Sequence, residues 1–277
     1  MADKIQCSTH GEAWATYVCA HLVGDKVGRG FNREEPSAEK RFPDACCDEC
    51  EKIRVAHGGW NEQSEKLTEI SLLCSSCYER ARIRNTRTAF SLQDLVGFRW
   101  KCGSCEEWHT GPCLDIAQPE PYYWDQTLDP GNIQVGTASL TELPATFLNE
   151  DFCAINGTDF FIRGIIQLPI LGTAENFCWG VWGSLSRDNF GRLLALHEDP
   201  KRVELPAMFS WLGSKLPDYP DTLSLKMYAR IQAPGDVPYF ELEPTDHPLA
   251  KEQHQGIGPE RVSEIMMTQV SEFEKPS

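Results

Sequence analysis

The sequence predicts an α+β protein: an antiparallel sheet with flanking helices, preceded by a small zinc-stabilised N-terminal domain. Three observations lead to this prediction. Short Cys/His pairs fill the first 113 residues, alternating apolar segments with turn residues follow, and two segments near the end each begin with proline, as helices often do. We place the finger-like zinc-binding domain at residues 1–88 and the acidic α+β domain at residues 97–277, with a linker near 85–96.

Four pairs of potential metal ligands occupy the N-terminal domain. They are Cys7 with His10, Cys19 with His21, Cys47 with Cys50, and Cys74 with Cys77. A two-residue gap lets one tight turn present two donors to an ion, and zinc takes four such donors in a tetrahedron. The spacing to Cys50 favours Cys47 over its neighbour Cys46. Because a domain this small and polar needs more than hydrophobic burial to fold, we predict that it holds two zinc ions.

The spacing leaves the partition of these pairs open. Sequential pairing joins the first pair with the second and the third with the fourth. Interleaved pairing joins the first with the third and the second with the fourth, as in cross-braced fingers. We favour the interleaved arrangement, because two interlocked ions rigidify a long loop better than two separate knuckles do.

A further group of donors lies at the start of the second domain. It comprises Cys102, Cys105, His109 and Cys113, and it predicts a zinc knuckle at 102–113, which brings the expected total to two or three ions. If Cys113 points away, His247 or an acidic residue would supply the fourth donor. Four protein donors close a zinc site, whereas three donors and a water are typical of catalytic zinc.

Charge and hydropathy limit the partners. The chain carries a net charge of −15, of which residues 91–277 contribute −14 and residues 1–90 only −1. An acidic surface repels phosphate backbones and attracts basic proteins, so a protein partner is favoured over nucleic acid. No run approaches the ~18–20 apolar residues of a membrane span. The start of the sequence lacks the apolar stretch of a secretion signal, which predicts a reducing cytoplasm where cysteine pairs bind metal rather than form disulfides.

The remaining elements follow from turn and cap signals. Residues 73–80 are expected to pass from a turn into a helix that ends near Arg84. In the second domain we expect a hairpin at 152–171 around Asn156-Gly157, a strand at 177–185, a helix at 188–197 capped by Asp188, a hairpin of strands 223–231 and 237–242, and helices at 248–255 and 259–273.

Candidate binding residues outside the cysteine groups are fewer. Glu243, Asp246 and His247 form a dense polar group, which has three interpretations. Thr245 or Asp246 would cap the helix beginning at Pro248, or the group would be a ligand or binding site, or His247 would be a general base oriented by an acid. The other candidates are Arg163, Trp179 and Trp182, of which the tryptophans are either core or the lining of an aromatic pocket. No nucleophile elbow or phosphate-binding loop is present, so no catalytic residue is assigned.

Several stretches of the second domain are similar to a known family. They are residues 102–105, 109–112, 160–164, 177–186, 216–223 and 242–250. On these stretches, residues 98 to about 265 resemble the bacterial family called domain of unknown function 2199. The resemblance implies a bacterial source and a C-x2-C-x3-H metal knuckle, and it implies no activity. The N-terminal segment resembles bacterial zinc-finger segments of the form Cys-x2-His-Gly…Val-Cys-x-His-Leu.

Three functions are compatible with these features. The favoured one is a zinc-binding cytoplasmic protein-interaction module, for example an immunity or adaptor protein for a basic partner. The second is a metal-dependent hydrolase that uses the Cys102/Cys105/His109 metal with Asp246 and His247. The third is a nucleic-acid-binding finger, against which the acidity argues.

Overall fold

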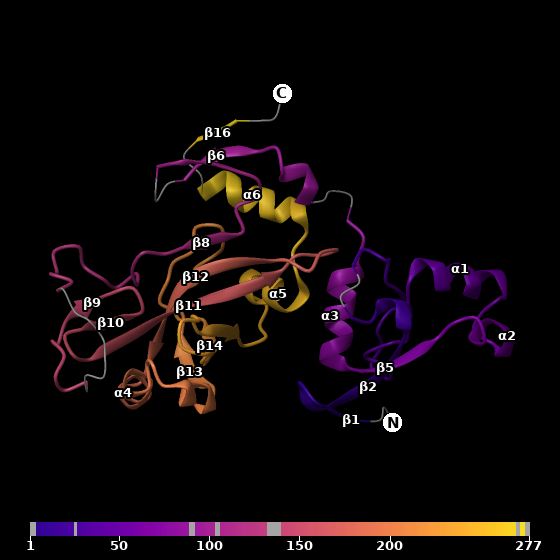
Figure 1. Cartoon of the computed structure of the whole chain (residues 1–277), viewed down its shortest axis with the longest axis horizontal. Coiled ribbons are helices and arrows are strands. Elements are labelled where there is room, and N and C mark those ends of the chain that lie inside the picture. Colours follow the sequence, from indigo (N-terminus) through magenta and orange to yellow (C-terminus); the bar gives the residue numbers. More distant parts are fainter. Residues whose placement is uncertain are drawn as a thin grey trace. The chain divides into compact units, whose positions relative to one another are not determined.

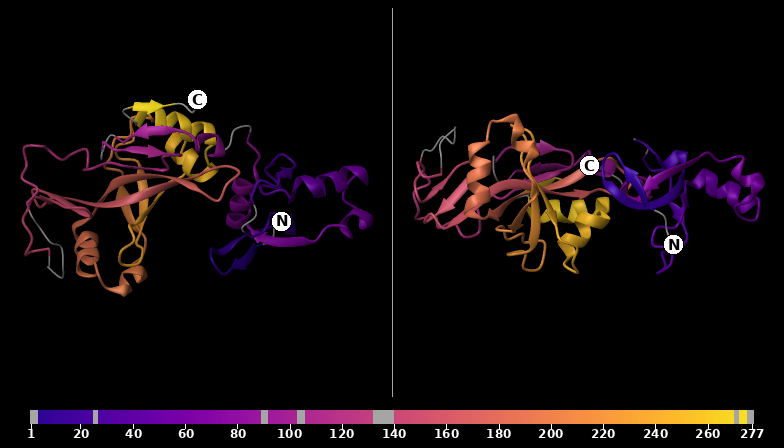
Figure 2. Two further views of the ribbon diagram at one scale, coloured as in Figure 1. Left: turned by 45° about the horizontal axis from the view of Figure 1, so that its top comes forward. Right: turned by 90° about the horizontal axis from the view of Figure 1, so that it is seen from below.

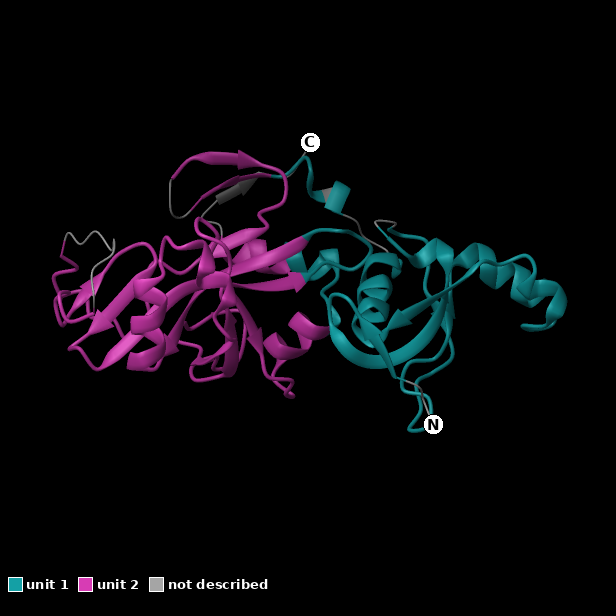
Figure 3. Ribbon diagram, turned by 60° about the horizontal axis from the view of Figure 1, so that its bottom comes forward, with its two compact units in different colours: residues 1–98, 169–175, 255–263 teal, residues 99–168, 176–254, 264–277 magenta. Residues whose placement is uncertain are grey.

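The chain forms two compact units. The computed structural model describes residues 4–24, 27–88, 92–102, 106–131, 140–269 and 272–274 (Figure 1). The first unit comprises residues 1–98 together with 169–175 and 255–263, and the second unit comprises the rest (Figure 3). Helices and mixed sheets occur in an α+β arrangement, as the sequence predicts.

The first unit is organised by one long strand. Strand β2 (Gly11–Cys19) follows β1 (Lys4–Cys7) in a hairpin and pairs antiparallel with β5 (Ile70–Cys74). The short strands β3 (Asn32–Arg33) and β4 (Ala45–Cys46) complete this sheet. Its helices are α1 (Asp48–Ala56), α2 (Glu62–Glu65) and α3 (Ser75–Asn85).

The apolar core of the first unit is small. Its buried cluster contains nine residues, and four of them are cysteines, so aliphatic and aromatic burial is limited. Tyr78 is the largest side chain of the cluster, and its hydroxyl donates a hydrogen bond to the carbonyl of Pro43 (2.6 Å). The exposed side chains of Tyr17, Ile70 and Leu72 leave apolar surface of this sheet in solvent. Hydrophobic burial alone is therefore weak here.

The second unit is built on a larger sheet. Strands β11 (Asp159–Pro169) and β12 (Asn176–Leu185) run together as a long pair in all views (Figures 1 and 2). The sheet continues through β15 (Tyr239–Leu242) and β14 (Lys226–Arg230) to β13 (Met208–Trp211). A bridge between Gly183 and Leu212 then returns β13 to β12, so these five strands close on themselves.

Glycine permits the close packing inside this closed sheet. A Cβ atom on Gly183 would lie 2.5 Å from Cζ of Phe240 and 2.6 Å from Cε of Met227, and one on Gly164 would lie 2.6 Å from the Phe240 ring. Phe240 and Met227 are both fully buried. The Phe240 ring therefore occupies the space that side chains at positions 183 and 164 would otherwise fill.

Shorter elements surround this sheet. The remaining strands are β6 (Arg99–Lys101), β7 (Trp108–Thr110), β8 (Asp115–Ala117), β9 (Phe147–Leu148), β10 (Phe152–Ile155) and β16 (Glu272–Glu274). Its helices are α4 (Arg187–Ala195) and α5 (Pro248–Gln255). Helix α6 (Pro259–Gln269) is divided between the units, with residues 259–263 in the first and 264–269 in the second. Figure 1 shows β16 beside β6, with which it pairs antiparallel.

Most predicted elements of the second domain are confirmed, and two details are wrong. The Asn156-Gly157 turn has φ values of 54° and 69°, as a type I′ hairpin turn requires. Ser186, not Asp188, caps α4, because its hydroxyl accepts the N–H of Asn189 (3.3 Å). The predicted last helix does not extend to residue 273, because residues 272–274 form strand β16.

Helix lengths and polarity also bear on membranes. Within the described ranges, every helix is too short or too polar to cross a bilayer.

Candidate metal centres

The eight N-terminal donors gather into two groups of four. One group contains Cys7, His10, Cys74 and Cys77; the other contains Cys19, His21, Cys47 and Cys50. In each group the donor atoms all lie within 4.8 Å of one another. The first pair thus meets the fourth and the second meets the third. Both partitions considered from the sequence, the sequential one and the favoured interleaved one, are wrong.

Strand β2 explains this nested pairing. Its nine residues span about 26 Å, so the pairs at its two ends cannot share an ion. Antiparallel β5 places Cys74 opposite Ala15 and Ile70 opposite Cys19, which brings the fourth pair toward the start of β2. Parallel β4 places Ala45 beside Val18, so that Cys47 follows at the other end.

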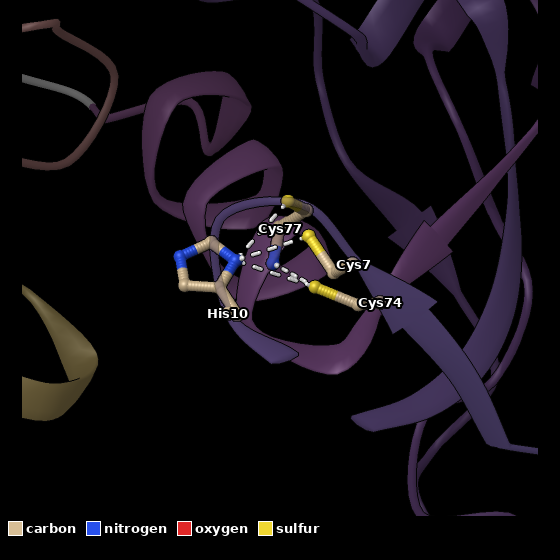
Figure 4. A group of neighbouring side chains, drawn as sticks. All are labelled: Cys7, His10, Cys74 and Cys77. Carbon is tan, nitrogen blue, oxygen red and sulfur yellow. Dashed lines mark hydrogen bonds between the residues drawn. The ribbon is translucent and has the colours of Figure 1, made fainter. Parts of the chain in front are cut away.

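The donor distances fit a tetrahedral ion. Nδ1 of His10 lies 3.6 Å from Sγ of Cys7, 3.4 Å from Sγ of Cys74 and 3.5 Å from Sγ of Cys77 (Figure 4). Zn–S bonds of about 2.3 Å and Zn–N bonds of about 2.0–2.1 Å at a tetrahedral angle give S···N separations of about 3.6 Å. One imidazole N–H cannot donate to three sulfurs at once, so this arrangement of donors suits shared coordination of an ion better than it suits hydrogen bonding.

The second group has the same donor set. Nδ1 of His21 lies 3.2 Å from Sγ of Cys50 and 3.6 Å from Sγ of Cys47. The backbone N–H of Cys47 donates to Sγ of Cys19 (3.2 Å), which joins the two pairs. Three cysteines and one histidine form a usual structural zinc set.

Helix N-termini hold one cysteine pair of each group. Cys74 caps α3 and Cys47 caps α1, and their sulfurs accept the N–H groups of Cys77 (3.4 Å) and Cys50 (3.5 Å). The positive end of a helix dipole favours the thiolate, which is the form that binds metal. The C-x2-C spacing therefore both caps the helix and presents two donors.

The thiols differ in how readily they ionise. The backbone N–H groups of Thr9 and His10 lower the pKa of Cys7 to about 6. Burial, followed by the neighbouring sulfurs of Cys74 and Cys7, raises the pKa of Cys77 to about 12. Burial likewise raises the pKa of Cys50 to about 12. A bound cation would displace the protons from Cys77 and Cys50, so acidification opposes metal binding.

Cys46 lies outside both groups. Its thiol donates to Oε2 of Glu51 (3.5 Å), whose carboxylate also accepts two hydrogen bonds from Arg54. The sequence argument that preferred Cys47 over Cys46 agrees with this placement.

The predicted third centre is only partly within the described residues. Cys105 lies outside them. Cys102, His109 and Cys113 are described, and they do not gather as a metal-binding group in that part of the chain. His109 stacks on Trp100 (4.7 Å between ring centroids), and the buried Cys113 thiol donates to the carbonyl of Asp115 (3.5 Å). A knuckle at 102–113 remains a prediction.

The polar group at 243–248 forms a helix start. Nδ1 of His247 accepts the N–H of Leu249 (3.2 Å), and Thr245 accepts the N–H of His247 (3.3 Å). Asp246 is fully exposed and pairs with Lys251 (3.0 Å). His247, rather than Thr245 or Asp246, therefore caps α5. The backbone N–H of Glu243 donates to the carbonyl of Lys226 (2.9 Å), at the end of the pairing of β15 with β14.

The two tryptophans are core residues. Trp179 and Trp182 are both 0% exposed, so neither lines an open aromatic pocket. Arg163 lies elsewhere, beside a cavity that also contacts His197 and Arg202. His197 and Arg202 could not be identified from the sequence, because no motif links them to Arg163 before the chain folds.

The two clusters on this fold define a protein with candidate metal centres. A family model matches residues 101–257, more than half of the chain, and its family is described as "Uncharacterized protein conserved in bacteria (DUF2199)". The chain therefore belongs to this family, as the resemblance predicted. Neither a curated protein nor a solved structure matches the chain.

Proposed function

We propose that this protein is a cytoplasmic zinc-binding interaction module, with two structural zinc ions in its first unit and an acidic second unit that binds a basic protein, as an immunity or adaptor protein does. The observation that carries the proposal is the donor count: each group supplies four protein ligands. Four protein ligands leave no position for a substrate or an activated water, so the ions would be structural rather than catalytic.

The small core of the first unit supports the structural role. Cysteines make up much of its buried cluster, and large apolar side chains remain exposed on its sheet. A structural zinc ion contributes about 10–16 kcal/mol of apparent binding free energy at pH 7, which is comparable with the whole net stability of an ordinary domain, about 5–15 kcal/mol. Metal and folding should therefore be coupled in this unit.

We expect two zinc ions per natively purified chain from the two described groups, and a third if the 102–113 knuckle binds. Treatment with a strong chelator should abolish amide protection in β2, β5, α1 and α3, while β10–β12 of the second unit stay protected. Hydrogen exchange with mass spectrometry measures both units in the same sample. A chain that lacks metal, or whose first unit keeps its protection after chelation, contradicts the proposal.

The charge distribution supports a basic partner. The net charge of −14 over residues 91–277 would accelerate association with a positively charged surface and make it dependent on salt. Glu243 and Asp246, which precede α5, are the acidic residues that the sequence predicts as a binding site. The Asp246 carboxylate is fully exposed, and a basic partner would compete for it with Lys251.

We expect the double variant Glu243→Gln/Asp246→Asn to slow association with the partner identified by cross-linking in cells. The association rate constant should also fall at least tenfold between low and physiological salt. The matched control is Glu62→Gln/Glu65→Gln, which removes two exposed charges from α2 in the first unit. An association rate constant that does not depend on salt counts against an acidic docking surface. So does one that both double variants change equally.

A further inference from the structure

The second unit contains a cavity of about 210 Å³ that the metal centres do not involve. This volume is large enough for several waters or one small metabolite. Its apolar wall includes Phe152, Ile162 and Leu193, and its charged residues include Arg163, His197 and Arg202. These side chains come from β10, β11, α4 and the turn that follows α4.

Arg202 is the unusual residue of this cavity. The residue is only 4% exposed. Its Nη1 donates one hydrogen bond to the carbonyl of His197 (2.8 Å). Its Nε has no hydrogen-bond partner, and no ion pair in the described part of the chain includes this guanidinium. Burial lowers the pKa of Arg202, and Asp151 and Asp236 oppose that shift only from a distance. Arg202 therefore lacks a counterion in the described part of the chain, and a buried cation without a paired anion is unfavourable.

The side chain of His197 also has a buried polar atom without a hydrogen-bond partner. Its Nδ1 is buried without a hydrogen-bond partner, while Nε2 lies 3.9 Å from a carboxylate oxygen of Asp151. The edge of its ring contacts Phe152, with 5.2 Å between the ring centroids. Two unpartnered polar atoms thus belong to residues that line one cavity, which is typical of a binding site and rare in a finished core.

The charges around the cavity restrict the ligand. Arg163 and Arg202 are positive, whereas Asp151, Glu198 and Asp236 are negative. The three carboxylates would repel a simple anion, and a simple cation would leave Arg202 unpaired. A molecule with both an ammonium and a carboxylate matches both sets of groups.

We propose that this cavity binds a free α-amino acid, whose carboxylate pairs with Arg202, whose ammonium faces Asp151 and Asp236, and whose side chain contacts Phe152. A guanidinium pairs with a carboxylate through parallel hydrogen bonds, which gives the site its orientation. The site belongs wholly to the second unit, and it is independent of the metals and of the protein partner.

The test is a titration of the full chain with each common α-amino acid at millimolar concentration, followed by saturation-transfer NMR and calorimetry. We expect at least one to bind, and its decarboxylated amine and deaminated acid to bind at least tenfold more weakly. For leucine these analogues are 3-methylbutylamine and 4-methylpentanoate. If no amino acid binds, or if the deaminated acid binds equally well, the proposal is overturned.

Variants separate binding from structure. Asp151→Asn and Asp236→Asn change exposed or half-exposed groups, and each should weaken binding about tenfold without altering the melting temperature. Arg202→Lys should weaken it at least as much. Glu204→Gln is the matched control, since this exposed acid lies in the same turn and outside the cavity. If the aspartate variants bind normally and Arg202→Lys only lowers the melting temperature, Arg202 is merely a cap for the end of α4.

Discussion

Exchanging Cys7 and Cys74 for histidine in the same chain is expected to change one metal centre, whereas exchanging Cys7 and Cys47 should change both. The nested pairing requires this, because Cys7 and Cys74 lie in one group and Cys47 in the other. Histidine also binds zinc and cadmium, so these variants keep four donors at every site. The resonance of cadmium-113 moves with the number of bound sulfurs. In Cys7→His/Cys74→His, the cadmium-113 signal of one site should shift far and that of the other should not change. In Cys7→His/Cys47→His, both signals should shift by similar, smaller amounts.

A third variant controls for the general effect of changing a buried cysteine. Cys46 adjoins Cys47 and is equally buried, yet its thiol contacts Glu51. Cys7→His/Cys46→Ala should therefore move one signal only. Alanine at Cys74 in place of histidine should remove a donor outright, and it should release that ion and the amide protection of β2 and β5. If Cys7→His/Cys47→His shifts one signal strongly and does not change the other, Cys7 and Cys47 share one ion. The interleaved pairing would then be correct and the nested pairing wrong.

The donors were predictable from the sequence, but their partition was not. Spacings such as Cys47-x2-Cys50 reflect one turn of chain, which local sequence controls. The partition depends on which strands pair with β2, and parallel β4 and antiparallel β5 come from far along the chain. Trp14, Thr16, Tyr17 and Val18 favour a strand and were the local signal for β2. Only the length that this strand reaches in the structure separates the first two pairs.

The second unit shows the same division between local and distant information. The Asn156-Gly157 turn and the helix that begins at Pro248 follow from residues that are neighbours in sequence. The cavity around Arg202 could not be predicted, because Asp151, Arg163 and Asp236 approach it from separate elements. The role of His247 was one of several open to a histidine before proline, and only the position of the Leu249 N–H identifies it as the cap.

Trp182→Ala is expected to lower the free energy of unfolding of the second unit by about 3–5 kcal/mol, the usual loss when a fully buried aromatic side chain is removed. The indole is 0% exposed and packs in a buried cluster with Trp124, Cys153 and Phe161, and its Nε1 donates to the carbonyl of Gln118 (3.1 Å). Its loss leaves a cavity and one unpaired carbonyl. Because the chain has two units, the transition should be followed by hydrogen exchange in β10, β11 and β12 rather than by a single melting curve.

Trp211→Ala is the matched control for this core position. Trp211 lies on β13, which bridges to the same strand as Trp182, but it is 41% exposed. Removing a half-exposed indole should cost about 1 kcal/mol or less, since little buried contact is lost. The difference between the two variants then measures burial rather than the chemistry of tryptophan. If both variants lose the same free energy of unfolding, burial of the Trp182 indole does not account for its contribution, and the assignment of Trp182 as a core residue is contradicted.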